Sequence, residues 1–286
     1  MFISFQKPGP SVRKAITALA CALLLSTTIV SPAFATARLT GQATQGGLLI
    51  GQVSPGSRLW LDQRPLQVTR DGSFIIGFGR DAQLRHQLKI ITGDGSEQHQ
   101  EILLTSRQYQ VEHVDGISPQ LMHPSAEDLQ RIAHERELIV TARQQTGSQS
   151  NFLETFRWPV TGRISGIYGS RRIYNGEPRR PHYGVDIAVP AGTPVRAPAG
   201  GIVRLAHPGM FFSGRTLIID HGLGLFSSFL HLQKILVKPG DRIEQGQPIA
   251  TVGASGRVTG PHLDWRINWF EQHLDPALLV PPMPTK

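Results

Sequence analysis

Cysteine is almost absent from this sequence: Cys21 is the only one in 286 residues. It stands in the middle of an apolar run from Ala15 to Val30, whereas a lipid-accepting cysteine follows such a run, so a lipoprotein is disfavoured. The run has three basic residues before it and the small-x-small segment Ala33-Phe34-Ala35 after it. This order is typical of a secretory signal peptide, and we assign residues 1–35 to one. A retained membrane anchor is the alternative, but the run is short for a spanning helix.

Without this signal peptide the chain has no cysteine at all. Disulfides and thiolate metal ligands are then excluded, and any zinc has to be held by His, Asp or Glu. We expect the protein to be exported across the inner membrane to the periplasm or another part of the cell envelope. We expect no stable membrane span after cleavage.

Acidic residues are fewer than basic ones. The signal segment holds 3 of the 29 Lys and Arg residues and no acid, so the mature chain has 26 basic against 21 acidic residues, a net charge of about +5. Outside the cytoplasm a basic surface suits an anionic wall or membrane. No motif of interleaved aromatic and basic residues is present, so we expect no nucleic acid partner.

Short alternating segments fill residues 36–117. Apolar residues alternate with others at Leu59 and Leu61, at Phe74, Ile76 and Phe78, at Leu88 and Ile90, and at Ile102 and Leu104. Pro-Gly and Asp-Gly pairs at 55–56, 71–72 and 94–95 separate these segments and predict turns. We therefore predict a small β-sandwich-like N-terminal domain. No chemically active residues cluster in it, so we interpret it as a packing or targeting module.

One helix is predicted within a linker at residues 118–151. Ser125-Ala126-Glu127-Asp128 resembles an N-terminal capping arrangement, and apolar residues follow at roughly helical spacing as far as Val140. Residues 134–138 (HEREL) begin like the HExxH zinc helix, but Leu138 stands where the second histidine is required. We therefore reject this segment as a metal site.

Residues 152–286 form the second predicted domain, with short strands and glycine turns. Residues 191–203 and 237–252 are similar to the hammerhead barrels of biotinyl and lipoyl carriers, although the carriers' exposed lysine is missing. Six of the eleven histidines lie in this domain: His182, His207, His221, His231, His262 and His273. We expect His221 to lie in a turn, and His207 and His273 at the surface.

Four blocks of this domain, in order, resemble the lysostaphin-type zinc endopeptidases, the M23 or LytM family. They are RISGIYGSRR at 163–172, HYGVDIAVPAGTPVRAP at 182–198, HGLGLFSSFLHL at 221–232 and VKPGDRIEQGQPIATVGASGRVTGPHLDW at 237–265. The resemblance covers about residues 158–275. It implies a mainly β protein with a C-terminal antiparallel β domain, and metal-assisted hydrolysis of peptide cross-links in peptidoglycan.

The resemblance also implies roles for five residues. The family's HxxxD motif supplies two zinc ligands, which correspond to His182 and Asp186. Its HxH motif supplies a catalytic histidine and the third ligand, which correspond to His262 and Asp264. The second catalytic histidine corresponds to His231, in a segment where Phe229 replaces the family's tyrosine. The two histidines would accept the proton of the attacking water or stabilise the oxyanion.

Asp264 departs from the family pattern, which has histidine there. A carboxylate oxygen binds zinc at about the same distance as an imidazole nitrogen, roughly 2.0 to 2.2 Å. The shorter side chain requires the metal to shift or the strand to approach. A second carboxylate also neutralises the zinc and weakens its polarising power, so we predict a slower site or one that prefers a harder metal such as Mn²⁺.

Arg179 and Arg180 precede His182 and are candidate substrate-binding residues, because arginine forks match carboxylates and wall stem peptides carry several. A solvated basic loop is the alternative. Two other functions stand beside the enzyme: a catalytically silent relative that activates a wall amidase, and a purely structural wall-binding module. A candidate ligand at each metal position and both catalytic histidines favour the enzyme.

Overall fold

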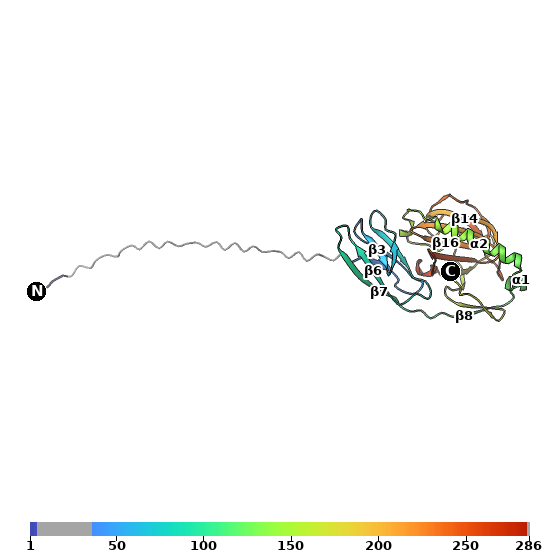
Figure 1. Cartoon of the computed structure of the whole chain (residues 1–286), viewed down its shortest axis with the longest axis horizontal. Coiled ribbons are helices and arrows are strands. Elements are labelled where there is room, and N and C mark those ends of the chain that lie inside the picture. The colour runs from blue at the N-terminus through green and yellow to red at the C-terminus, as the bar shows by residue number, and fades with distance from the viewer. Residues whose placement is uncertain (5–35, 285–286) are drawn as a thin grey trace. The chain divides into compact units, whose positions relative to one another are not determined.

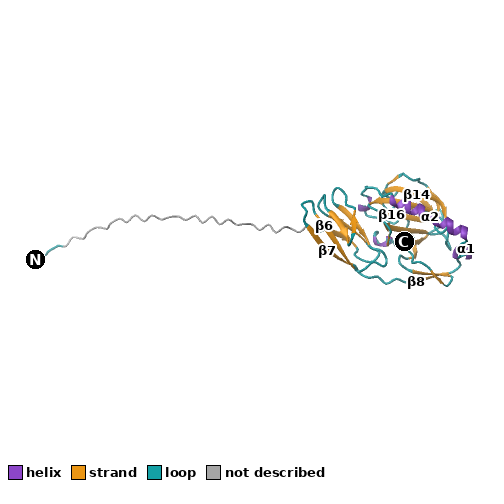
Figure 2. Ribbon diagram, viewed as in Figure 1, coloured by secondary structure: helices purple, strands orange, loops and turns teal. Residues whose placement is uncertain are grey.

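The structure, a computed structural model, describes residues 1–4 and 36–284. Most of the signal peptide predicted at residues 1–35 lies outside the described residues. Strands dominate the secondary structure (Figure 2), and the predicted mainly β class is confirmed. No helix within the described residues has both the length and the apolar character needed to cross a membrane.

Two antiparallel sheets are formed by the first seven strands (Figure 1). One sheet has the order β1-β2-β5, with strands Arg38–Gly41, Leu48–Gln52 and Ser73–Gly77. The other has the order β4-β3-β6-β7, with strands Arg64–Leu66, Arg58–Leu61, Arg85–Ile91 and Glu97–Leu103. The alternating apolar residues expected in these strands are buried.

The predicted turns are also present. Gly56, Gly72 and Gly95 each have a positive φ, between 81° and 91°, a conformation that glycine adopts without steric cost. Each is the second residue of a Pro-Gly or Asp-Gly pair from which a turn was predicted.

Strand β8 (Val111–Val114) joins this region to the next one. It pairs in parallel with β10 (Arg171–Tyr174), which also pairs with β11 (Glu177–Pro178). The short helix α1 (Pro119–Met122) follows. The predicted boundary at residue 117 therefore falls in a segment that already contacts the second half, and the division into domains stays a prediction.

Helix α2 (Ala126–Gln144) begins where the capping pattern predicts. Ser125 and Asp128 form a reciprocal capping box. The large apolar residues at helical spacing do not form a buried face, since Leu129 and Val140 are 56% and 48% exposed. Its buried residues are Glu135 and Ala142.

Glu135 has a structural role, which agrees with the rejection of HEREL as a metal site. Its carboxylate accepts hydrogen bonds from Arg131 Nε (2.7 Å) and from the backbone N–H of Phe211 (2.8 Å). The helix is thereby fixed to the loop at Phe211.

The second half is built on one ten-stranded sheet, whose main path runs β17-β14-β15-β16-β19-β12-β9. These strands are Arg242–Ile243, Gly201–Met210, Gly214–Gly222, Leu225–Ile235, Leu263–Trp269, Val185–Ala188 and Arg163–Gly166. Strands β13 (Pro194–Arg196), β18 (Pro248–Val252) and β20 (Gln272–Leu274) complete it. β13 and β18 pair with each other and come from the two segments that are similar to hammerhead barrels.

Two short 3-10 helices, Asn151–Leu153 and Pro276–Leu278, flank this sheet in the sequence. A single apolar core includes buried residues from both halves, such as Phe74 and Ile76 from β5 and Trp269 and Leu274 from the last strands. At the junction, a Cβ on Gly77 would meet the Cβ of Trp269 at 2.8 Å. Glycine is therefore required for this close approach of the two regions.

Candidate active site

Three neighbouring strands bring the predicted site residues together. Asp186 on β12 stands directly opposite Asp264 on β19, and Asp264 stands opposite Leu230 on β16, next to His231. Residues opposite each other in an antiparallel pair share one face of the sheet. A Cβ on Gly184 would lie 2.5 Å from the Asp264 carboxylate, so glycine there gives the carboxylate room.

His182, Asp186 and Asp264 form a compact set of metal ligand atoms. One ligand atom from each lies within 4.8 Å of the others, and all three residues are buried. His182 Nε2 and Asp186 Oδ1 form an ion-pair contact at 3.1 Å, and apart from this contact neither has a hydrogen-bond partner among the described residues. Buried polar atoms without partners are rare unless an ion or water satisfies them. The donor set therefore fits a divalent metal ion.

Asp186 is held ionised by the groups around it. Burial alone would raise its pKa, but His182, then Arg172 and His262, outweigh burial and keep the pKa well below its ordinary value. Arg172 Nη2 donates to Asp186 Oδ2 at 2.5 Å, which leaves Oδ1 facing His182. One oxygen is thus fixed by arginine and the other is free to bind a metal.

Asp264 is 2% exposed and has a close partner that the sequence reading did not consider. Arg266, two residues further along β19, donates from Nε to Oδ1 and Oδ2 at 3.0 and 3.1 Å and from Nη2 to Oδ2 at 2.6 Å. Burial would raise the pKa of Asp264, but Arg266 outweighs burial and lowers the pKa. The candidate third ligand is therefore an ionised carboxylate clamped by a guanidinium.

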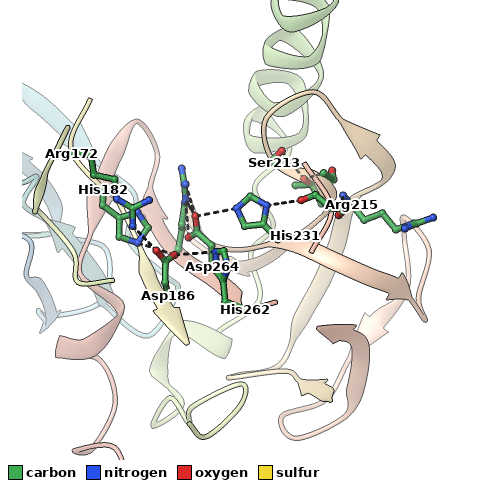
Figure 3. A network of polar contacts seen from close by, with 12 residues as sticks. Arg172, His182, Asp186, Ser213, Arg215, His231, His262 and Asp264 are labelled. Atoms are coloured by element: carbon green, nitrogen blue, oxygen red, sulfur yellow. Dashed lines mark hydrogen bonds and ion pairs between the residues drawn. The ribbon is translucent and has the colours of Figure 1, made fainter. Parts of the chain in front are cut away.

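His231 lies at a β-bulge of β16. Arg215 and Leu217 on β15 face Leu232 and Phe229, so β16 has one extra residue at this point. His231 adopts φ 62°, a left-handed conformation that is unfavourable for a residue with a side chain. Its backbone N–H donates to the Ser213 carbonyl at 2.8 Å. Bulges next to active sites commonly re-aim a side chain, and this one directs the imidazole toward Asp264 (Figure 3).

The protonation state of His231 follows from its contacts. Nδ1 is 2.8 Å from the Ser255 carbonyl, which only accepts, so Nδ1 carries the hydrogen and Nε2 has a lone pair. Nε2 is 4.0 Å from Asp264 Oδ2. Burial lowers the pKa of His231 to about 4, against a smaller opposing effect of Asp264. The ring is therefore neutral at pH 7.

His262 has a similar arrangement. Its Nδ1 is 2.9 Å from the Gly260 carbonyl, so Nδ1 carries a hydrogen, and its Nε2 lies 3.8 Å from Asp186 Oδ1. The rings of His231 and His262 have centroids 4.9 Å apart. Figure 3 shows the two rings on the side of the carboxylates away from His182. All five predicted metal and catalytic residues thus lie in one site, although their roles stay predictions.

Arg179 and Arg180 differ in their surroundings. Arg179 Nη2 donates to Glu177 at 2.7 Å and to the Met122 carbonyl at 3.2 Å, so this guanidinium is occupied by structural contacts. Arg180 is exposed and has no ion pair within the described residues. Both line a cavity of about 780 Å³ that also includes His182, His231 and Asp264.

The expectations for two other histidines were wrong. His221 lies in strand β15, not in a turn, and is fully buried, where Nδ1 donates to the Gly200 carbonyl (2.6 Å) and Nε2 contacts Ser227 Oγ (2.8 Å). His273 lines the cavity, and its ring stacks on Tyr183 with centroids 4.2 Å apart. Burial and then Arg266 lower its pKa to about 3.

Several arginines of the cavity were not predicted from the sequence. Arg136 and Arg143 come from α2, and Arg257 and Arg266 flank Asp264 in the sequence. Arg266 had a usable signal, because a residue two positions from Asp264 on a strand shares its face. Arg136 and Arg143 had none, because nothing in the helical pattern says which face of α2 meets the site.

Comparisons with known proteins agree with this geometry. The model of the family described as "Peptidase family M23" matches residues 180–276. The peptidoglycan DD-endopeptidase ShyA of Vibrio cholerae is 41% identical over 116 residues, which are 39% of this chain and 26% of ShyA. The DD-carboxypeptidase/endopeptidase Mpg of Neisseria meningitidis is 34% identical over 126 residues, 44% of this chain and 29% of Mpg. The chain spans about a quarter of the length of the curated relatives it matches.

A solved structure extends the likeness beyond the catalytic region. A structure described as an M23 peptidase from Pseudomonas aeruginosa is 28% identical, with a TM-score of 0.63, and covers 84% of this chain and 95% of its own. The likeness therefore includes the N-terminal strands. Through residues 180–276, the chain belongs to peptidase family M23.

Proposed function

We propose that the chain is an exported, zinc-dependent endopeptidase that hydrolyses peptide cross-links of peptidoglycan in the cell envelope. Relatives named as peptidoglycan DD-endopeptidases support the substrate class. One observation carries the proposal: buried ligand atoms of His182, Asp186 and Asp264 lie within 4.8 Å of one another, and His182 Nε2 and Asp186 Oδ1 have no hydrogen-bond partner beyond their mutual 3.1 Å contact. In a metal site these two atoms would share the ion as a partner instead of only facing each other.

The ligands proposed for the metal are His182, Asp186 and Asp264. When bound there, Zn²⁺ supplies Lewis-acid chemistry, since it polarises a carbonyl oxygen and lowers the pKa of water. Arg172 and Arg266 each hold one carboxylate ligand, which orients the ligands before the metal arrives. By spreading negative charge away from the ligand atoms, these arginines also partly offset the extra carboxylate at position 264.

His231 and His262 are proposed to handle the protons. Each commits its Nδ1–H to a backbone carbonyl, so each offers an Nε2 lone pair to the site. A neutral ring in this position accepts a proton from the attacking water, and the protonated ring then stabilises the oxyanion or protonates the leaving amine. The carbonyl contacts also fix the orientation of both rings.

Metal content and product release test this function. Purified mature protein is expected to contain one equivalent of zinc, or of manganese, by elemental analysis, and to release uncrosslinked muropeptides detectable by mass spectrometry. Asp264→Ala is expected to lose both the metal and the release. Protein that binds no metal and releases nothing, yet is folded, would contradict the proposal and favour the amidase activator.

A further inference from the structure

The cavity beside the candidate ligands is rich in arginine. Its walls come from helix α2, from the residues that precede His182, and from strands β16 and β19. Within this lining, Asp264 is the one residue with a carboxylate. Three of the lining arginines have an acidic partner: Arg172 pairs with Asp186, Arg179 with Glu177 and Arg266 with Asp264.

Four other lining arginines have no acidic partner among the described residues: Arg136, Arg143, Arg180 and Arg257. Arg257 has aromatic contacts instead, with its guanidinium carbon 4.3 Å from the ring centroid of Phe212. An arginine that faces open solvent needs no partner. Several arginines that share one cavity repel each other, because water screens their charges less well there.

Arg143 is the clearest example of a cavity arginine without an acidic partner among the described residues. It comes from the last turn of α2, and its Nη2 donates to Ser228 Oγ at 3.1 Å, while its Nε is buried without a hydrogen-bond partner in the described part of the chain. Burial, and after it the neighbouring Arg266, lower the pKa of Arg143 to about 10. Ser228 stands directly opposite Arg266 in the sheet, so the two guanidiniums meet above the same pair of strands.

A third arginine, Arg180, lines the same cavity, and so does His273. Burial and then the positive charges of Arg266, Arg143 and Arg180 lower the pKa of His273. Asn268 Nδ2 donates to His273 Nδ1 at 2.9 Å, which leaves Nε2 as an N–H donor on an uncharged ring. Three guanidiniums and a neutral N–H donor therefore line one cavity, and Asp264 is the one carboxylate of that lining.

We propose that Arg143, Arg180 and Arg266 form an anion subsite that binds a carboxylate of the peptide substrate next to the bond that is cleaved. This inference rests on the proposed function and deepens it, since it assigns helix α2 to the substrate site through Arg143. Arg266 uses Nε and Nη2 for Asp264 and keeps Nη1 for the ligand. A cavity of about 780 Å³ has room for a short peptide.

Two peptides that differ in one group test the subsite. They are cross-linked stem peptides with the same scissile bond, one with a free carboxylate on the residue beside it and the other with the corresponding carboxamide. The wild type is expected to have a higher kcat/KM for the acid. Arg143→Gln is expected to reduce the acid-to-amide ratio of kcat/KM roughly tenfold, the loss of one hydrogen bond to a charged group, and Arg143→Lys is expected to restore part of it.

Arg163→Gln is the matched control, because Arg163 is an exposed arginine of β9 outside the cavity. Its acid-to-amide ratio is expected to stay within about twofold of the wild type, since exposed charges contribute little. An unchanged ratio in both Arg143→Gln and Arg180→Gln, with normal thermal unfolding, would overturn the subsite.

Calorimetric binding of the two peptides separates this inference from the proposed function. If neither peptide is hydrolysed, the function fails, but the subsite still predicts tighter binding of the acid by the wild type and loss of that preference in Arg143→Gln. Inorganic phosphate is the competing probe. If phosphate displaces the acid peptide at equal concentration, the site is a general anion site and the assignment to a peptide carboxylate is wrong.

Discussion

The two halves of the described chain bury different kinds of side chain. Between residues 38 and 103 the buried polar residues are serines, Ser57 and Ser73, within an apolar core. Between residues 163 and 275 the buried set also includes histidines and aspartates. Burying such groups costs free energy unless they are paired. Their concentration in one half therefore marks the half that carries the chemistry, while the buried part of the other half is almost entirely apolar.

The two halves are nevertheless joined. The apolar core is continuous, and β8 pairs with β10 across the predicted domain boundary. The contrast between them concerns what is buried and not whether they fold separately. Substitutions in each half can therefore separate chemistry from packing.

The largest expected effect is on catalysis. His262→Ala should reduce kcat by about 10² to 10⁴, the usual contribution of a general acid or base, while metal content stays unchanged because His262 is not a proposed ligand. His99→Ala, in strand β7 of the other half, should leave kcat within about twofold of the wild type. Steady-state kinetics with purified cross-linked muropeptides gives both values, and equal losses in the two variants would remove the distinction between the halves.

The next effect concerns the Asp264 and Arg266 pair. Asp264→His should destabilise the protein by about 1.5 to 3 kcal/mol, because Arg266 loses its hydrogen-bonded charged partner. Adding Arg266→Gln should recover part of that loss and allow zinc binding through the new imidazole. Urea unfolding and elemental analysis measure the two properties. Full stability of Asp264→His alone would show that Arg266 does not depend on Asp264.

A substitution at the junction tests how closely the halves are coupled. Gly77→Val places a side chain against Trp269 and Leu274 and should cost about 1 to 3 kcal/mol through overpacking. Because the core is shared, we expect a single unfolding transition at a lower temperature by calorimetry. Two separate transitions would instead indicate that the halves unfold independently.

The smallest effect is on the pH dependence of stability. Burial lowers the pKa of His221 below its ordinary value of 6.5, so the unfolded chain takes up a proton more readily than the folded one. Stability should therefore fall as the pH drops below about 6.5. His221→Asn should make that fall shallower between pH 7 and 5 without removing it, because His231 and His273 have lowered pKa values too. Thermal melts across this range measure the slope, and an identical slope would exclude His221 as a contributor.

Much of the fold was predictable because it depends on local patterns. Alternation and Asp-Gly turns placed β3, β5, β6 and β7, and the capping box placed the start of α2. The buried face of α2 was not predictable in this way. Leu129 and Val140 are exposed while Glu135 is buried, because the partner of the helix is a polar loop and a charged cavity and not an apolar core.

The candidate site was predictable only through the family resemblance. Asp186 and Asp264 are far apart in the sequence, and strand register, which the sequence does not state, places them opposite each other. The arginines of α2 were not predicted either. A guanidinium on a helix usually faces solvent, and only the packed structure reveals that Arg143 lies beside Arg266.

Because of the left-handed backbone at His231, selection for stability and selection for activity favour different residues at this position. A glycine at this position would adopt φ 62° without strain, so a screen for heat resistance would favour losing the imidazole. A screen for wall hydrolysis would favour keeping it. Laboratory evolution of this protein toward durability should therefore be run with a functional filter from the first round.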